Sequence, residues 1–274
     1  MEIIIDACID SLKALPFLFL AYYLIEYLEH KVELQRIQGW MKHKKAGVCA
    51  GALLGAFPQC GFSVTSANLY TSHLISAGTV LAVFISTSDE AIPILLAEPE
   101  MLPQIGKILL IKIAAGIVVG LLVDFVWRNQ RTVHNLHDVC QECHCEERSI
   151  LKSALHHTGE LFLFLLAVNL ILGFVMAGVS EAVLEKLFLN GSIFQPFLTS
   201  LIGLIPNCAA SVALTELYLA GHIAFGSLIA GLCSGAGLGM VLLFKMNKHM
   251  KDNMIILAVL YGTAVITGIL VNMG

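Results

Sequence analysis

Apolar residues run along this chain in segments of about twenty, the length that a helix needs to cross a bilayer, and short polar stretches separate them. Full-length apolar runs lie near 11–28, 74–96, 104–126, 161–178, 222–244 and 254–271. The apolar segments 46–57 and 62–72 are too short to cross alone, and so are those around Pro206. The pattern predicts an all-α integral membrane protein.

Composition supports this class. The chain is 57% hydrophobic and 13% charged with a mean hydropathy of +0.82, whereas about 25% of the residues in a soluble domain are charged. A net charge of -4 argues against nucleic-acid binding. The acidic N-terminus and the absence of a small-residue cleavage site predict that the first apolar run stays as a helix.

Two stretches of the chain repeat each other. Residues 58–70 and 206–218 are identical at six of thirteen positions without a gap, where chance would give about one. At the same offset Gly78 matches Gly226, and Ser86 matches Ser234. The sequence therefore predicts a tandem duplication, a common feature of transporters.

Charge bias predicts the sidedness of the spans. Basic residues cluster at 31–45, at 128–152 and at 245–251, and the positive-inside rule places these loops in the cytoplasm. Both termini and the acidic turn 98–100 are then outside, and the halves enter the membrane from opposite sides. We expect an inverted repeat of two five-helix halves with paired broken or re-entrant helices, comprising 1–126 and 153–274, joined by a cytoplasmic loop over 127–152.

If the segment that follows each repeated proline is helical, one face of that helix carries polar side chains in both copies. Across an inverted two-fold axis, these faces would form one substrate site whose thiols suit softer metals. The alternative is that small polar residues here only let membrane helices pack closely. The candidate substrate-binding residues are Gln59, Cys60, Ser63, Asn68 and Tyr70 in the first copy, and Asn207, Cys208, Ser211, Thr215, Glu216 and Tyr218 in the second.

Asp89 and Glu90 form a second candidate site, because buried carboxylates in a membrane usually bind cations or relay protons. Pro93 leaves the Asp89 carbonyl without its helical partner. The alternative is an acidic pair that faces water at the end of a shorter helix. The second copy has Ser-Gly-Ala-Gly at 234–237, so the acidity is one-sided.

The central loop carries enough borderline and soft ligands for a tetrahedral Zn²⁺ or similar site, although the pattern does not name the ion. A solvated loop with chance Cys and His residues is the alternative. Cys140 to His144 also match the c-type haem attachment pattern, but that attachment occurs outside the cytoplasm. The six candidate metal ligands are His134, His137, Cys140, Cys143, His144 and Cys145.

The motifs Pro-Gln-Cys-Gly at 58–61, Pro-Asn-Cys at 206–208 and Thr-Ser-Asp-Glu-Ala-Ile-Pro at 87–93, with the His/Cys-rich loop, resemble the ten-transmembrane heavy-metal exporters. This family is also described as manganese transporters and is related to arsenical permeases. The resemblance covers nearly the whole chain. It implies a bacterial inner-membrane permease of ten helices that moves a metal or metalloid.

We therefore expect a secondary-active transporter that exports a transition or soft heavy metal ion by alternating access. The alternatives are a permease for an organic anion or organometalloid, and a membrane metal or redox sensor that uses the His/Cys loop. The sequence lacks a P-loop, a His-Glu-x-x-His motif and serine-based catalytic motifs, so we expect no enzyme. The expected partners are the lipid bilayer and the metal ion or small solute; no cofactor is required, and a homo-oligomer stays open.

Overall fold

The computed structural model describes residues 44–57, 60–72, 74–87, 91–97, 101–127, 194–247 and 249–273. It also describes isolated helical residues between 12 and 23 and between 155 and 171. The predicted first span of each half, 11–28 and 161–178, thus lies mostly outside the described residues, as does the His/Cys loop. Every regular element in the described part of the chain is a helix, which confirms the all-helical expectation.

The described helices fall into two series. The first consists of α3 (Lys44–Gly55), α4 (Cys60–Thr71), α5 (Ala77–Ser86), α6 (Ala91–Leu96) and α7 (Leu102–Val126). The second consists of α10 (Gln195–Gly203), α11 (Cys208–Leu219), α12 (Phe225–Ser234), α13 (Leu238–Met246) and α14 (Met250–Met273). The short helices on either side of Pro58 and Pro206 match the predicted short segments.

Four helical stretches of the described chain are long and apolar enough to cross a membrane: Ala77–Leu96, Leu102–Val126, Phe225–Met246 and Met250–Met273. They match four of the predicted spans. The first and third are 80% and 83% buried in the protein, whereas the second and fourth are 28% and 33% buried. The span α5–α6 and the span α12–α13 therefore form the core, and α7 and α14 expose apolar side chains to lipid, including Leu110 and Leu270.

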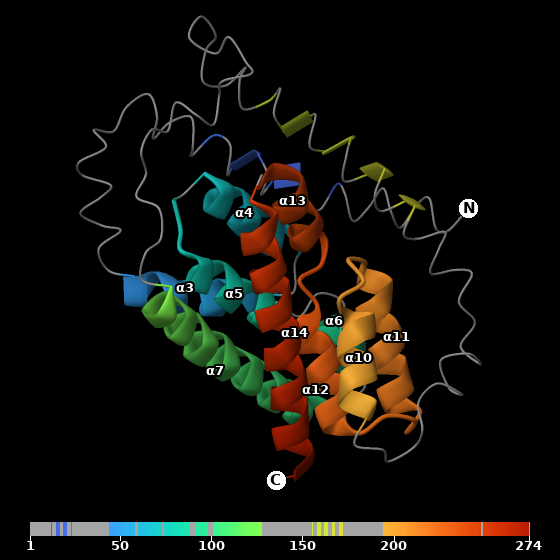
Figure 1. Ribbon diagram of the computed structural model, residues 1–274. Coiled ribbons are helices and arrows are strands. Elements are labelled where there is room, and N and C mark those ends of the chain that lie inside the picture. The colour runs from blue at the N-terminus through green and yellow to red at the C-terminus, as the bar shows by residue number, and fades with distance from the viewer. Residues whose placement is uncertain are drawn as a thin grey trace, which may run out of the picture.

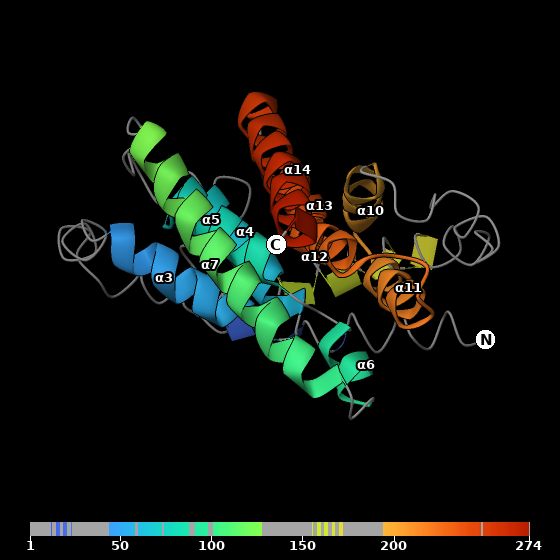
Figure 2. The same cartoon turned by 90° about the horizontal axis from the view of Figure 1, so that it is seen from below.

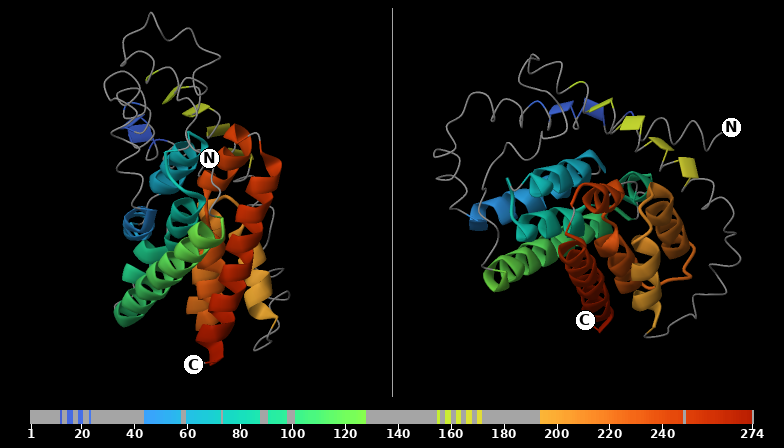
Figure 3. Two further views of the ribbon diagram at one scale, coloured as in Figure 1. Left: turned by 60° about the vertical axis from the view of Figure 1, so that its left-hand side comes forward. Right: turned by 45° about the horizontal axis from the view of Figure 1, so that its top comes forward.

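Helix pairing follows the same scheme in both series. Helix α5 packs between α3 and α7, and α12 packs between α10 and α14 (Figures 1 and 2). The second part of each core span reaches across to the other series, because α13 packs on α4 and α6 packs on α11. Figure 3 shows the two groups side by side with α13 at their junction. The two series of helices therefore pack against each other and form one common interior.

Glycines allow the closest helix approaches in both series. A Cβ atom added to Gly78 would lie 2.1 Å from the carbonyl oxygen of Gly120, and one added to Gly226 would lie 2.3 Å from that of Gly268. No side chain fits at such distances, so α5 meets α7, and α12 meets α14, backbone to backbone. Small residues at helix crossings are the usual device for close packing in membranes.

Side chains from a neighbouring helix satisfy the first amides of both core spans. Asp124 accepts hydrogen bonds from the Gly78 amide (3.0 Å) and the Ser76 hydroxyl (2.6 Å). At the matching place Asn272 accepts from the Gly226 amide (2.9 Å). These contacts satisfy N–H groups that a helix leaves without internal partners. We therefore assign Asp124, a carboxylate within an apolar run, to the structural contact between α5 and α7.

The structure corrects the predicted core spans in one respect, because each of them is interrupted. Helix α5 ends at Ser86 and α6 begins at Ala91, while α12 ends at Ser234 and α13 begins at Leu238. In the second break Gly237 has a φ of 54°, a conformation that glycine adopts without strain. The signal was present in the sequence as Ser-Gly-Ala-Gly at 234–237.

Candidate functional site

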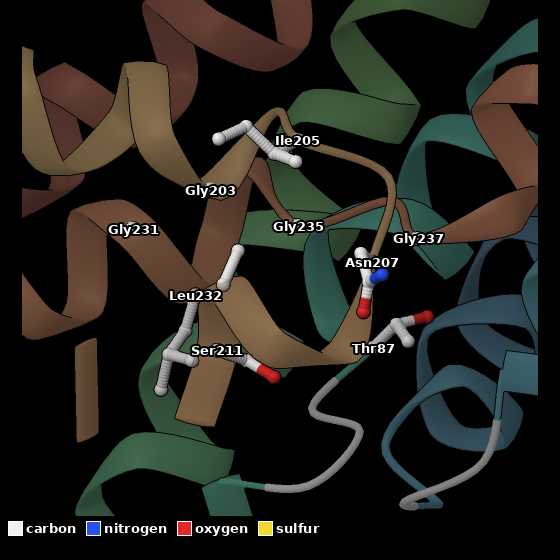
Figure 4. Close-up of a pocket in the computed structure, with 10 residues that line it drawn as sticks. Thr87, Gly203, Ile205, Asn207, Ser211, Gly231, Leu232, Gly235 and Gly237 are labelled. Atoms are coloured by element: carbon white, nitrogen blue, oxygen red, sulfur yellow. The ribbon is translucent and has the colours of Figure 1, made fainter. Parts of the chain in front are cut away.

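Three of the helix ends described above line one pocket (Figure 4). One wall is the turn between α10 and α11, a second is the break between α12 and α13, and a third comes from Thr87 after the end of α5. Its cavity volume is about 20 Å³, which is enough for one water molecule or a dehydrated ion. The lining residues are Thr87, Gly203, Ile205, Asn207, Ala210, Ser211, Gly231, Leu232, Gly235 and Gly237.

The break at Pro206 follows directly from the local sequence. Pro206 has no amide hydrogen and cannot continue the hydrogen-bond ladder of α10, which ends at Gly203. Asn207 is extended (φ -143°, ψ 141°), and its Oδ1 atom accepts a hydrogen bond from the Ala209 amide at 2.9 Å. Asn207 is thus the N-cap of α11. Because Asn207 also lines the pocket, the positive end of the α11 dipole lies at its wall.

The predicted polar face of α11 is present. The Ser211 hydroxyl donates to the Cys208 carbonyl at 2.7 Å, and the Thr215 hydroxyl donates to the Ser211 carbonyl at 2.7 Å. Each hydroxyl proton is therefore used inside the helix, and the oxygen lone pairs remain as acceptors. Ser211 lines the pocket, whereas Thr215 is fully buried and Cys208 carries a partly buried thiol one residue from Asn207.

The first copy of this face packs differently. Pro58, Gln59 and the side chain of Cys60 lie outside the described residues. Ser63 is fully buried where α4 crosses α13, and a Cβ atom on Gly239 would lie 2.6 Å from the Ser63 carbonyl oxygen. Asn68 is also fully buried, and neither polar atom of its side-chain amide has a hydrogen-bond partner among the described residues. Among the described residues of α4, none lines the pocket.

Three further candidates in the described part of the chain, Tyr70, Glu216 and Tyr218, do not line the pocket. Tyr218 donates a hydrogen bond to Gln104 on α7, Glu216 is exposed, and Tyr70 is partly buried. Asp89 and Glu90 lie outside the described residues, and so do all six candidate ligands of the His/Cys loop. In the part of the chain that the structure describes, no three His, Cys, Asp or Glu side chains come together as a metal site.

The sequence interpretation missed Lys112 and Thr87. Lys112 lies in the middle of α7 with no exposed surface, and its Nζ atom donates to the carbonyl oxygens of Thr87 and Leu232, each at 2.5 Å. Both acceptor residues line the pocket. The available signal was a single lysine inside an apolar run of membrane length, because an intramembrane charge commonly marks a functional site.

A helical multi-pass membrane protein whose core spans break around a small pocket has the broken-helix architecture that many transporters share. A family model with the description "Putative, 10TM heavy-metal exporter" matches residues 1–193 and 178–274, and the chain belongs to this family. The resemblance noted in the sequence motifs is therefore confirmed. No curated protein and no solved structure matches the chain.

Proposed function

We propose that this protein exports a transition or soft heavy metal ion by alternating access, with the ion bound in the pocket at the helix breaks. The observation that carries the proposal is the meeting of helix ends from both series at one small cavity. Broken helices at the midplane place free backbone groups where a substrate binds, while the rest of each span stays satisfied within the bilayer.

The chemistry of the pocket supports an ion as cargo. Backbone carbonyls at the ends of α5 and α12, the Asn207 amide and the Ser211 hydroxyl supply oxygen ligands. The Cys208 thiol lies beside Asn207 and would add a soft ligand after a small movement of the α11 N-terminus. Cys60 is its counterpart in the repeated sequence, so two thiols would serve one site across the repeat axis.

An inverted repeat would supply the two exchanging states. The matched contacts Gly78–Asp124 and Gly226–Asn272 support a repeat. In Figure 1, α7 runs from the lower centre towards the upper left and α14 runs from the top to the C-terminus at the bottom. These opposed directions support the inversion. Rocking of one repeat against the other would then open the pocket to each side in turn.

A second candidate cargo is an organic anion or organometalloid. Two observations favour it, namely the α11 N-terminus at the pocket wall and the buried Lys112 ammonium beside it. Both would stabilise negative charge. Against it, the ammonium already donates to two backbone carbonyls, which leaves it less able to bind an anion.

Radiotracer flux into proteoliposomes tests the proposal. Purified protein would be assayed with Zn²⁺, Mn²⁺ and Cd²⁺ separately, with and without a pH gradient. We expect flux of at least one metal, and loss of that flux in the Cys60→Ser/Cys208→Ser double variant because the soft ligands are gone. Full flux in the double variant would argue against a metal ion held by the two thiols, and no flux for any metal would contradict metal export.

We place the His/Cys loop in this scheme as a metal-capture or sensing segment on the cytoplasmic side of a bacterial inner membrane, with both termini outside. Its six ligands would take up metal before transport. Deletion of residues 133–147 distinguishes a loop that captures or senses metal from a loop that forms part of the transport path. We expect maximal flux to persist and the flux at low metal concentration to fall. Complete loss of flux in correctly folded protein would place the loop on the transport path itself.

A further inference from the structure

Lys112 joins the two series of helices through a single buried ammonium. It belongs to α7, and its Nζ atom contacts the Thr87 carbonyl oxygen of the first series and the Leu232 carbonyl oxygen of the second, each at 2.5 Å. Its side chain has no exposed surface. A buried charge is costly unless polar groups surround it, so these carbonyls are part of what holds the ammonium there.

The two carbonyls stand where a cation is favoured. Thr87 is the C-cap of α5, and Leu232 lies in the last turn of α12. The final carbonyls of a helix lack internal partners, and together they form the negative end of its dipole. In transporters, such half-helix ends coordinate the transported or coupling cation. In this protein a lysine ammonium occupies that position.

The same residues line the pocket in which the metal ion is proposed to bind. A cation in that cavity would have Thr87 and Leu232 in its wall, and it would compete with Lys112 if it used the carbonyl oxygens of these two residues. Two like charges this close in a low-dielectric interior repel each other strongly, so the arrangement admits one or the other.

We propose that the Lys112 ammonium is a built-in competitor of the transported cation, occupying the carbonyl oxygens of Thr87 and Leu232 while the site is empty. The inference rests on the proposed metal export and deepens it by assigning two backbone ligands and a gate. While bound, the ammonium ties the first series to the second. Arrival of the metal ion displaces it and frees the two series to move.

Lys112 has no charged counterpart at the corresponding position of the second half. The position that corresponds to Lys112 in the second half is Leu260, which is fully buried. The repeat therefore provides one ammonium group at this position rather than two, as expected if the pocket accepts a single cation at a time.

Metal binding to detergent-solubilised full-length protein tests the competition. Every protein in this comparison, including the one called wild type at position 112, would carry serine at Cys140, Cys143 and Cys145, so that metal binding by the loop thiols does not mask binding in the pocket. Isothermal titration with Zn²⁺, Mn²⁺ and Cd²⁺ would compare wild type with Lys112→Gln, which keeps a hydrogen-bond donor and removes the charge. We expect the dissociation constant to fall by about threefold or more, because the competing ammonium is gone.

Two controls bound the result. Lys112→Arg keeps the charge and is expected to bind metal no more tightly than wild type. Lys107→Gln changes an exposed lysine on the same helix and is expected to leave binding unchanged. Equal or weaker metal binding by Lys112→Gln would overturn the inference while leaving metal export intact. Absence of both binding and flux in the wild-type protein would remove the proposed function as well.

A measurement on the wild-type chain covers the case in which Lys112→Gln does not fold. Amine-reactive labelling followed by mass spectrometry would report how accessible the Lys112 amine is with and without the transported metal. We expect the labelling rate to rise when metal displaces the ammonium from its carbonyls. A rate that does not change at saturating metal would overturn the inference.

Discussion

The two helix series share their backbone contacts and differ in their polar chemistry. Gly78 meets Gly120 as Gly226 meets Gly268, so the same crossing is built twice. At the start of that crossing, however, the first series has the carboxyl group of Asp124 where the second has the amide group of Asn272, and Lys112 corresponds to Leu260. The duplicated frame thus sets where the helices break, and residues present in one half set the charge at the breaks.

The glycine crossings give the largest expected effect. Gly78→Val and Gly226→Val each force a side chain against a backbone carbonyl, and we expect each to lower the free energy of unfolding by about 3 kcal/mol. Denaturation in mixed micelles would measure it. Gly262→Ala is the control, because no atom lies within 4 Å of its added Cβ. A loss in only one of the two valine variants would break the structural equivalence of the halves.

A second prediction concerns a contact that exists only in the second series. Gln195 accepts from the Ala224 amide (3.0 Å) and the Ser227 hydroxyl (2.8 Å), and donates to the His222 carbonyl (3.0 Å). Gln195→Leu removes all three hydrogen bonds, so we expect the free energy of unfolding to fall by about 2 kcal/mol.

The corresponding control in the first series is Ser76→Ala. Ser76 is the N-cap of α5, and it accepts from the Thr79 amide at 3.1 Å. Its loss should cost about 1 kcal/mol, typical of an N-cap. A larger loss of stability for Ser76→Ala than for Gln195→Leu would contradict the expected order, in which the Gln195 contacts stabilise the second series more than the Ser76 cap stabilises the first.

The smallest expected effect comes from exchanging the residue types of Asp124 and Asn272, which accept hydrogen bonds from the first amides of α5 and α12. Asp124→Asn keeps an acceptor for the Gly78 amide but replaces the oxygen that accepts from the Ser76 hydroxyl by an amide nitrogen, so we expect a loss of about 1 kcal/mol. Asn272→Asp is the reciprocal change. It should give no gain in stability, because Asn272 also donates to the Ser227 hydroxyl through its amide nitrogen. Stabilisation by Asn272→Asp would contradict this explanation of the difference.

The sequence predicted the features that depend on local patterns. Apolar runs located four spans in the described structure, and Pro206 with Asn207 located the start of α11. The internal breaks at Ser86 and Ser234 were harder to predict, because the apolar residues on both sides continue the span and only the glycines at 235 and 237 indicate the second break.

The composition of the pocket depends on contacts that a pattern does not contain. Thr87 and Leu232 are far apart in the chain and meet through Lys112. The matching polar faces of α4 and α11 suggested equal contributions, yet Ser63 packs against Gly239 while Ser211 lines the pocket. Which face turns inward depends on how α4 crosses α13, and the repeat of residue types does not determine that crossing.

The most direct test of the account is metal flux through a filled pocket. Wild type and Ser211→Leu would be reconstituted at equal density, and uptake of the transported metal would be measured in both. The leucine side chain would occupy the cavity of about 20 Å³, so we predict a fall in flux of about tenfold or more with an unchanged unfolding midpoint. Wild-type flux in Ser211→Leu would contradict transport through this pocket.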